Sequence, residues 1–181
     1  MALTEYVKRY GSRRDWLLIA TLTYTGARIS EVLALTPDDV DVEASAIRIK
    51  QLKKRKEAYK IIPIPRWLAR QLAEFGGFHL SRVQAWRIIR YWTERFLGRP
   101  VRPHAFRHAY GTYLLRTTKD VELVRRILGH KSYHWVQEYM DYSLYDLQED
   151  LQKAWKVVNA LNKKKRRHID RTDFPEEKPS K

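Results

Sequence analysis

Two short alternating segments around a basic turn limit the folds that this chain can adopt. Hydrophobic and polar residues alternate in residues 45–52 and again in 58–64, and the charged sequence KKRKE lies between them. Alternation with a period of two predicts β-strands, so the pair predicts a β-hairpin with a basic tip. Residues 39–42 are expected to add a third strand and complete a small antiparallel sheet.

Most of the remaining sequence has the hydrophobic spacing of helices. One helix is predicted at residues 13–25 and should end at Gly26, and a short one should run from Ser30, as its cap, to Leu35. After the hairpin, helices are predicted at residues 66–75, 81–97, 104–117, 120–128, 133–141 and 144–162. The expected fold is therefore α+β and mostly α, a helical domain with a small three-stranded antiparallel sheet.

The length of the chain favours one domain. Its 181 residues, 44% of them hydrophobic, are enough for one ordinary core with little left for a second. We expect this domain to occupy residues 1–162. Residues 163–181 are basic, polar and interrupted by proline, and they are expected to form a disordered tail.

The charge of the chain predicts a polyanionic partner. Thirty-six Lys and Arg residues against twenty-one Asp and Glu give a net charge of +15. Nucleic acid is the first candidate, and an anionic membrane surface is the second. We expect no membrane insertion, because no apolar run approaches the length of a spanning helix.

The chain contains no cysteine, which excludes disulfides and thiolate zinc sites. This composition fits a reducing compartment. The first residues, MALTEYVKRYGSRRDW, lack the continuous apolar centre of a signal peptide. We therefore expect a cytoplasmic protein.

Five residues have the chemistry needed to cut DNA without a metal ion. His104 and Arg107 lie in HAFRHAYGTYLL, His130 and Tyr139 follow in LGHKSYHWVQEYM, and Arg28 lies in TGARISEVLAL. Arginine can bind two phosphate oxygens at once, and histidine can donate a hydrogen bond or move a proton. The phenol of tyrosine, with a reference pKa of about 10, needs nearby cations to become a nucleophile.

These three segments, in this order and spacing, resemble the signature boxes of the tyrosine recombinases. That family includes phage-type integrases and Xer-type chromosome-dimer resolvases, and the resemblance covers about residues 4 to 161. It implies a catalytic domain that cleaves and rejoins DNA strands through a 3′-phosphotyrosyl intermediate. No cofactor and no metal ion are implied.

The resemblance also implies a role for each of the five residues. Arg28 and Arg107 would be the two phosphate-binding arginines, and His104 would be the histidine that begins the second box. His130 fills a position that is histidine or tryptophan in the family. Tyr139 would be the nucleophile.

Two further roles follow from the resemblance. Glu31 matches an acidic residue that supports the first arginine. The family also has a lysine at the tip of a β-hairpin, which protonates the leaving 5′ oxygen. We assign this role to Lys53, with Lys54 and Lys56 as alternatives, because all three lie in the hairpin turn.

The family implies partners as well. Double-stranded DNA is the expected substrate, and a homo-oligomer on DNA, a tetramer, is the expected assembly. Residues 144–162 have a hydrophobic stripe that suits packing on a neighbouring protomer or within the same chain. Most family members carry an N-terminal DNA-clamping domain, and nothing of that kind precedes residue 4. We therefore expect either a fragment of a longer enzyme, which we favour, or a naturally minimal enzyme.

Two other functions compete with this one. A type IB topoisomerase uses the same chemistry to relax supercoils, but the short spacing from LGH to the tyrosine favours a recombinase. A non-catalytic DNA-binding protein could keep the fold, although binding alone does not require the tyrosine. Tyr142, three residues after Tyr139, is the alternative nucleophile.

Overall fold

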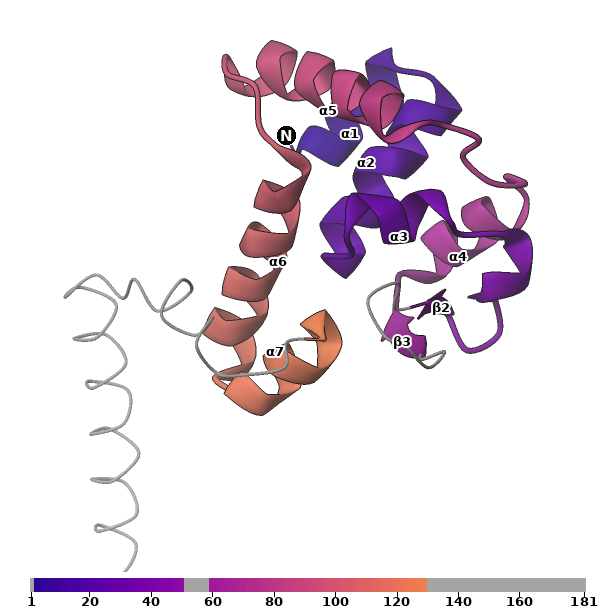
Figure 1. Ribbon diagram of the computed structural model, residues 1–181, viewed down its shortest axis with the longest axis vertical. Coiled ribbons are helices and arrows are strands. Elements are labelled where there is room, and N and C mark those ends of the chain that lie inside the picture. The colour runs from indigo at the N-terminus through magenta and orange to yellow at the C-terminus, as the bar shows by residue number, and fades with distance from the viewer. Residues whose placement is uncertain (1, 51–58, 130–181) are drawn as a thin grey trace, which may run out of the picture. The chain divides into compact units, whose positions relative to one another are not determined.

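The computed structural model describes residues 2–50 and 59–129, and these residues form a mostly helical fold with one small sheet (Figure 1). They all belong to one compact unit of the chain, Met1–Tyr139. The predicted fold class is confirmed. The predicted helices 133–141 and 144–162 and the tail 163–181 lie outside the described residues.

The elements follow one another along the chain in a simple order. They are α1 (Leu3–Tyr10), α2 (Arg13–Thr25), α3 (Ile29–Leu33), a 3-10 helix η1 (Pro37–Asp39), β1 (Val40–Asp41), β2 (Ala46–Lys50), β3 (Tyr59–Pro63), α4 (Arg66–Ala73), α5 (Arg82–Leu97), α6 (Pro103–Thr118) and α7 (Val121–Leu128). The helices predicted at 13–25, 66–75, 81–97, 104–117 and 120–128 are confirmed to within about two residues at each end, the usual uncertainty of a helix boundary.

The sheet contains both strands of the predicted hairpin, β2 in the centre and β3 at one edge. Its strand order is β1-β2-β3, and both pairs are antiparallel. Ile47 lies opposite Ile62, and both are buried, whereas Ile61 on the other face is 72% exposed. Alternation therefore turns one face of the sheet toward the core.

Helix α2 is the centre of the core. Seven consecutive residues, from Trp16 to Leu22, are at most 9% exposed, and α2 contacts α1, α4, α5 and α6. A helix buried on all sides is held by packing and not by an amphipathic stripe. A smaller cluster of Leu115, Val124 and Leu128 joins α6 to α7.

Two local predictions were wrong or incomplete. The third helix begins at Ile29 and ends at Leu33, and Arg28, not Ser30, is its N-cap residue. The reason is that the Glu31 carboxylate accepts the backbone N–H of Arg28 and so satisfies the helix end from within. Helix α1 was not predicted, although Val7 on its inner face is fully buried.

None of the helices within the described part of the chain is long and apolar enough to span a membrane.

Candidate active site

The first site residue, Arg28, lies at the turn that joins α2 to α3. Its guanidinium Nη1 donates to Glu31 Oε1 at 2.8 Å, and its backbone N–H donates to Glu31 Oε2 at 2.9 Å. Both bonds use the same carboxylate, so the side chain and the backbone of Arg28 are fixed together. The Arg28 side chain remains 34% exposed, which leaves part of it facing solvent.

The carboxylate that holds Arg28 is itself buried and has a second cation beside it. Lys60 Nζ lies 3.2 Å from Glu31 Oε2, and the two side chains are only 6% and 2% exposed. Burial alone would raise the pKa of Glu31, but Lys60 and the hydrogen bonds from Arg28 outweigh burial and lower the pKa. Burial likewise lowers the pKa of Lys60, and the neighbouring Glu31 charge only partly opposes that shift.

The second arginine, Arg107, is 1% exposed and connects three helices. It extends from α6, and its Nη1 donates to the carbonyl oxygen of Gly26 at 3.1 Å, while Nη2 donates to the carbonyl oxygen of Leu128. Those carbonyls belong to the C-terminal ends of α2 and α7. A buried guanidinium is stable only when its donors are satisfied, and these carbonyls also complement its charge.

Gly26 makes this arrangement possible. Its φ of +57° lies in the left-handed region, and a Cβ added there would be 2.5 Å from the Tyr110 ring. Only glycine allows the chain to turn from α2 toward Arg28 while α6 packs this closely. The same residue offers its carbonyl to Arg107, so this turn positions both arginines.

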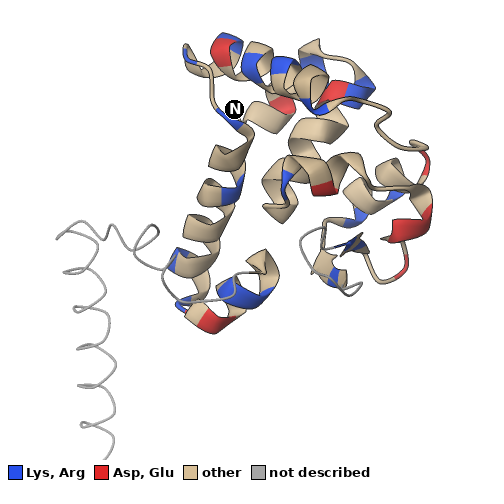
Figure 2. Ribbon diagram, viewed as in Figure 1, with Lys and Arg blue, Asp and Glu red and all other residues tan. Residues whose placement is uncertain are grey.

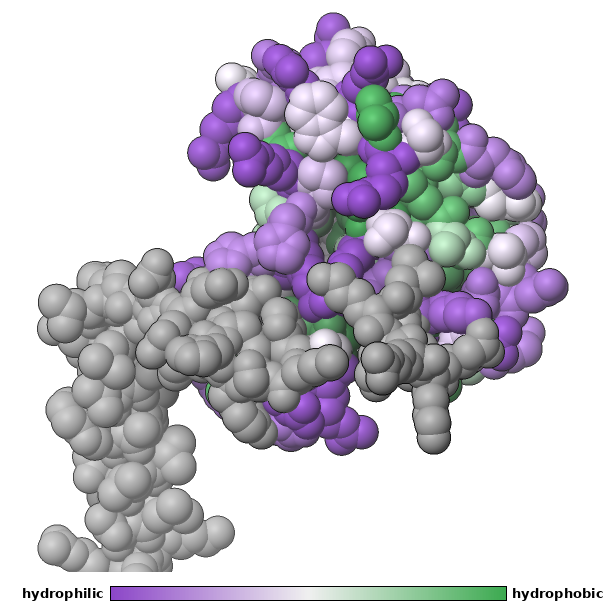
Figure 3. Space-filling model, viewed as in Figure 1, coloured by the Kyte–Doolittle hydropathy of each residue, from purple (hydrophilic) through white to green (hydrophobic). Residues whose placement is uncertain are grey.

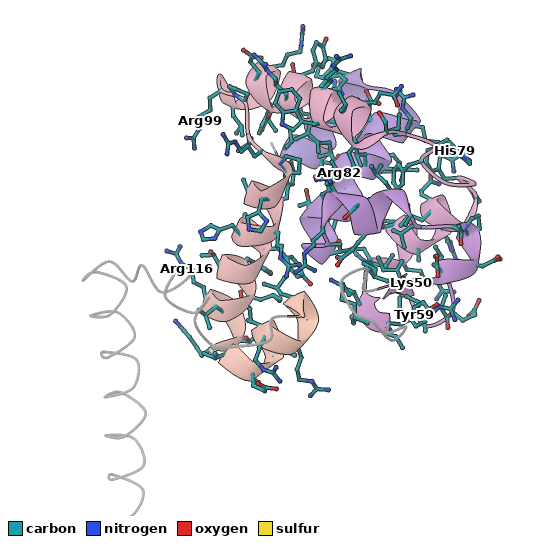
Figure 4. All side chains as sticks on the ribbon, in the orientation of Figure 1. Lys50, Tyr59, His79, Arg82, Arg99 and Arg116 are labelled. Atoms are coloured by element: carbon teal, nitrogen blue, oxygen red, sulfur yellow. The ribbon has the colours of Figure 1, made fainter. Side chains whose placement is uncertain are left out.

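Arg28, Arg107 and His104 line one pocket of about 1040 Å³. His104 is exposed and lies one helical turn before Arg107 on α6. Arg82 and Trp86 from the start of α5, with Arg102, add to the same wall. Figure 4 places Arg82 at the end of α5 that approaches α3.

The pocket is strongly basic. Four arginines and a histidine line it, and none of the described lining residues is acidic. Basic residues also follow α5 and part of α6 (Figure 2). On the face drawn in Figure 3, hydrophilic residues cover much of the outer edge while hydrophobic ones show nearer the centre. A pocket of this charge suits an anion such as a phosphodiester.

The structure therefore brings together three of the six predicted site residues, namely Arg28, His104 and Arg107. The other three, Lys53, His130 and Tyr139, lie outside the described residues. The predicted support of Arg28 by Glu31 is present as a direct ion pair. Residues 2–50 and 59–129 contain no group of three His, Asp or Glu side chains that could hold a metal ion.

Sequence reasoning missed four residues of the site and its support. Arg82 and Trp86 lie four residues apart on α5, a spacing that puts them on one face, but nothing in the sequence linked that face to Arg28. Arg102 lies two residues before His104, the first residue of the second box. Lys60 occupies an inward position of β3, where alternation predicts a hydrophobic residue.

Comparison with known proteins identifies the class. The sequence profile described as the phage integrase family matches residues 1–144, which is most of the chain. The chain therefore belongs to the phage integrase family. Relatives that it matches are named tyrosine recombinases.

Individual relatives agree with this class. The tyrosine recombinase XerA of Thermococcus kodakarensis is 28% identical over 185 residues, covering 88% of this chain and 64% of that protein. The tyrosine recombinase XerD of Corynebacterium glutamicum is 31% identical over 157 residues, covering 75% of this chain and 51% of that protein. The chain thus spans about half to two thirds of the length of these relatives.

Solved structures share the fold. A crystal structure of XerA recombinase superposes with a TM-score of 0.68 at 24% identity, over 84% of this chain and 61% of that one. The XerH site-specific recombinase bound to its difH substrate gives a TM-score of 0.66 at 20% identity, over 82% of this chain and 50% of that one. At these identities the likeness concerns the fold alone.

Proposed function

We propose that this chain is the catalytic domain of a tyrosine site-specific recombinase, which cuts and rejoins double-stranded DNA through a 3′-phosphotyrosyl intermediate. The observation that carries the proposal is the basic pocket on which Arg28, His104 and Arg107 converge. Membership in the phage integrase family supports it, and so does similarity to relatives that are named tyrosine recombinases.

In this mechanism the pocket holds the scissile phosphate. Arg28 and Arg107 donate to the two non-bridging oxygens, and His104 and His130 donate further hydrogen bonds as negative charge grows. Such donors contribute most when they are fixed before the reaction begins. Arg107 meets that condition, because two backbone carbonyls fix its guanidinium where it lines the pocket.

The covalent step follows from the residue types. The Tyr139 phenolate attacks phosphorus and forms an O–P bond, and the bond from phosphorus to the 5′ oxygen breaks. Lys53, with Lys54 and Lys56 as alternatives, gives a proton to the leaving 5′ oxygen. Rejoining is the reverse reaction, with a 5′ hydroxyl as the nucleophile. One phosphoester replaces another, so the reaction needs no cofactor.

The wall of the pocket extends the contact with DNA. Arg82 and Arg102 add cations beside the clamp, and Trp86 adds an aromatic surface that is 40% exposed. Arginines placed this way contact phosphates and fix the register of a protein on a duplex. Double-stranded DNA is therefore the proposed substrate.

The proposal also covers the extent of the domain and its assembly. The catalytic domain would occupy residues 1–162 and the basic tail residues 163–181, with residues 144–162 docking on a neighbouring protomer of a tetramer. The protein would act in the cytoplasm. A type IB topoisomerase is the alternative enzyme, and relaxation of supercoiled DNA without dependence on a site would favour it.

The proposal is tested with a nicked DNA substrate whose cleaved end diffuses away and traps the covalent intermediate. The protein and the variants Tyr139→Phe and Tyr142→Phe are incubated with it in EDTA and analysed on a denaturing gel. A protein–DNA band from the unmodified chain and Tyr142→Phe, but not from Tyr139→Phe, is expected. A band from the unmodified chain and Tyr139→Phe, but not from Tyr142→Phe, would assign the nucleophile to Tyr142. DNA binding without a band from any of the three proteins would contradict a catalytic role.

A further inference from the structure

Among the residues that the structure describes, the proposed mechanism leaves one buried charged side chain, Lys60, without a role. Lys60 lies on β3 opposite Ile49, on the face of the sheet where Ile62 is also buried. Its ammonium reaches Glu31 Oε2 at 3.2 Å, and its side chain is only 6% exposed. A lysine is almost never buried this deeply unless it is paired.

Around Glu31 the charges do not cancel. One carboxylate is shared by two cations, Arg28 on Oε1 and Lys60 on Oε2, so the group carries a net charge of +1. Arg28 is the partly exposed member, and Lys60 is the buried one. The excess positive charge therefore lies at the pocket, where Arg28 faces solvent.

We propose that Lys60 is a positioning residue for the phosphate clamp, formed by Arg28 and Arg107. Lys60 engages one oxygen of Glu31, so that Arg28 pairs with the other oxygen only. The group of Arg28, Glu31 and Lys60 then keeps a net positive charge that can attract a DNA phosphate. This inference rests on the proposed function. It goes beyond that function by giving a role to a residue that does not touch the DNA.

The geometry explains why a second cation is needed. An arginine and a carboxylate prefer a bidentate pair with two parallel hydrogen bonds. Lys60 and the backbone N–H of Arg28 both occupy Glu31 Oε2, which leaves only Oε1 for the guanidinium. Without Lys60, both oxygens could turn to Arg28, and the pair would become neutral and would compete with the phosphate.

The burial of Lys60 argues against a role in stability alone. Taking a lysine out of water is costly, and burial lowers the pKa of Lys60. Breaking a buried pair is costly when it leaves a buried charge without a counter-ion, but Lys60→Met leaves Glu31 paired with Arg28 and puts an apolar side chain on the face that holds Ile62. Lys60→Met is therefore expected to fold, and any loss of function should appear at the pocket.

The test compares four proteins with the unmodified chain: Lys60→Met, Lys60→Arg, the double variant Lys60→Met/Glu31→Gln, and the control Arg48→Met. Arg48 lies on the exposed face of the same sheet, so its removal changes the net charge equally without touching Glu31. The first readout is the binding of inorganic phosphate, which is monitored by NMR through the side-chain N–H signals of Arg28. The second is the single-turnover rate of covalent complex formation on saturating nicked DNA, measured with the DNA dissociation constant.

Lys60→Met should weaken phosphate binding and slow cleavage by about tenfold, less than the hundredfold or more expected for losing a direct donor. DNA affinity should change by less than about threefold, because many other phosphate contacts remain.

Lys60→Arg should recover most of the rate, since it keeps the charge. The double variant should recover part of it, because removing Glu31 restores a net charge of +1; a merely structural role would predict further loss. Arg48→Met should match the unmodified chain.

Equal phosphate binding and equal rates in Lys60→Met would overturn the inference while leaving the proposed function intact. A double variant that is slower than Lys60→Met would also overturn it. Absence of phosphate binding at Arg28 in the unmodified chain would overturn it as well. If phosphate binding depends on Lys60 but no covalent complex forms, the proposed function fails and the role of Lys60 stands.

Discussion

At the scale of the residue, Glu31 is the group on which the site depends most. It caps α3, holds Arg28 and neutralises Lys60, all from a side chain that is 2% exposed. Three functions on one carboxylate mean that a change at Glu31 alters both stability and the position of Arg28.

Glu31→Gln should therefore destabilise the protein by about 3–5 kcal/mol at neutral pH, because Lys60 becomes a buried charge without a counter-ion. The penalty applies while Lys60 is protonated. Since burial lowers the pKa of Lys60, the penalty should shrink as the pH rises through that lowered value. Urea unfolding of both proteins at pH 7 and at higher pH measures this, and a penalty that grows with pH would contradict it.

The opposite pH limit tests the unmodified chain. The pKa of Glu31 is lowered in the fold, so its contribution to stability is complete above its unfolded pKa of about 4.3 and is lost as the pH falls through the folded value. The unmodified chain should lose stability over this range more steeply than Glu31→Gln. Parallel acid titrations of the two proteins would refute the assignment.

Gly26 offers a residue-scale test of packing. Gly26→Ala should cost more than the roughly 1–2 kcal/mol of a left-handed alanine, because its Cβ would also meet the Tyr110 ring. Gly98 is the matched control, since its φ is +70° and a Cβ there would meet nothing within 4 Å. Thermal unfolding should show Gly98→Ala losing only the backbone contribution. Equal losses of stability in Gly26→Ala and Gly98→Ala would mean that the contact with Tyr110 adds no destabilisation.

At the scale of the element, three parts of the chain line the pocket, namely α5, α6 with its preceding residues, and the turn between α2 and α3. Each contributes its N-terminal end or its flanking turn, where side chains project past the packed core. On α5, Ala85 and Ile89 face the core, while Arg82 and Trp86 line the pocket. The amphipathic pattern of α5 therefore separates packing from binding.

Arg82→Gln should weaken DNA binding and make the slope of log K against log salt shallower by about 1, because one phosphate contact is lost. Arg87→Gln is the matched control, because Arg87 is an exposed arginine on the same helix that does not line the pocket. Fluorescence anisotropy over a range of salt concentrations distinguishes them. Equal slopes for the two variants would remove α5 from the proposed DNA surface.

At the scale of the whole molecule, the excess of positive charge should dominate binding. Four arginines line the pocket, and because Arg28 and Arg107 share one phosphate, three phosphate contacts predict a slope of log K against log salt of about −2.7. A fourfold rise in salt should then weaken binding by about fortyfold. A flat salt response would exclude phosphates as the main contact.

The sequence predicts much of this molecule because its patterns are strong and local. Alternation around KKRKE predicted the sheet, and Gly26 marked a helix end that the structure confirms. The convergence of Arg28 with Arg107 required the resemblance, because 79 residues separate them and only packing brings them together.

The rest depends on tertiary contacts that no local pattern encodes. Serine is a preferred residue type at helix caps, yet in α3 the Glu31 carboxylate, and not Ser30, satisfies the N-terminal end. Lys60 stands at an inward strand position where alternation predicts a hydrophobic residue, and only the folded chain places it beside Glu31. In both cases a buried charge decides the geometry, and burial is a property of the folded chain.

One measurement tests the central claim most directly: the single-turnover rate of covalent complex formation on nicked DNA, for the unmodified chain, Arg28→Ala and Arg87→Ala. We expect Arg28→Ala to slow the reaction by at least about a hundredfold, as the loss of a fixed phosphate donor does. Arg87→Ala should keep the rate of the unmodified chain. Equal rates for Arg28→Ala and the unmodified chain would show that the pocket does not hold the phosphate that is cut.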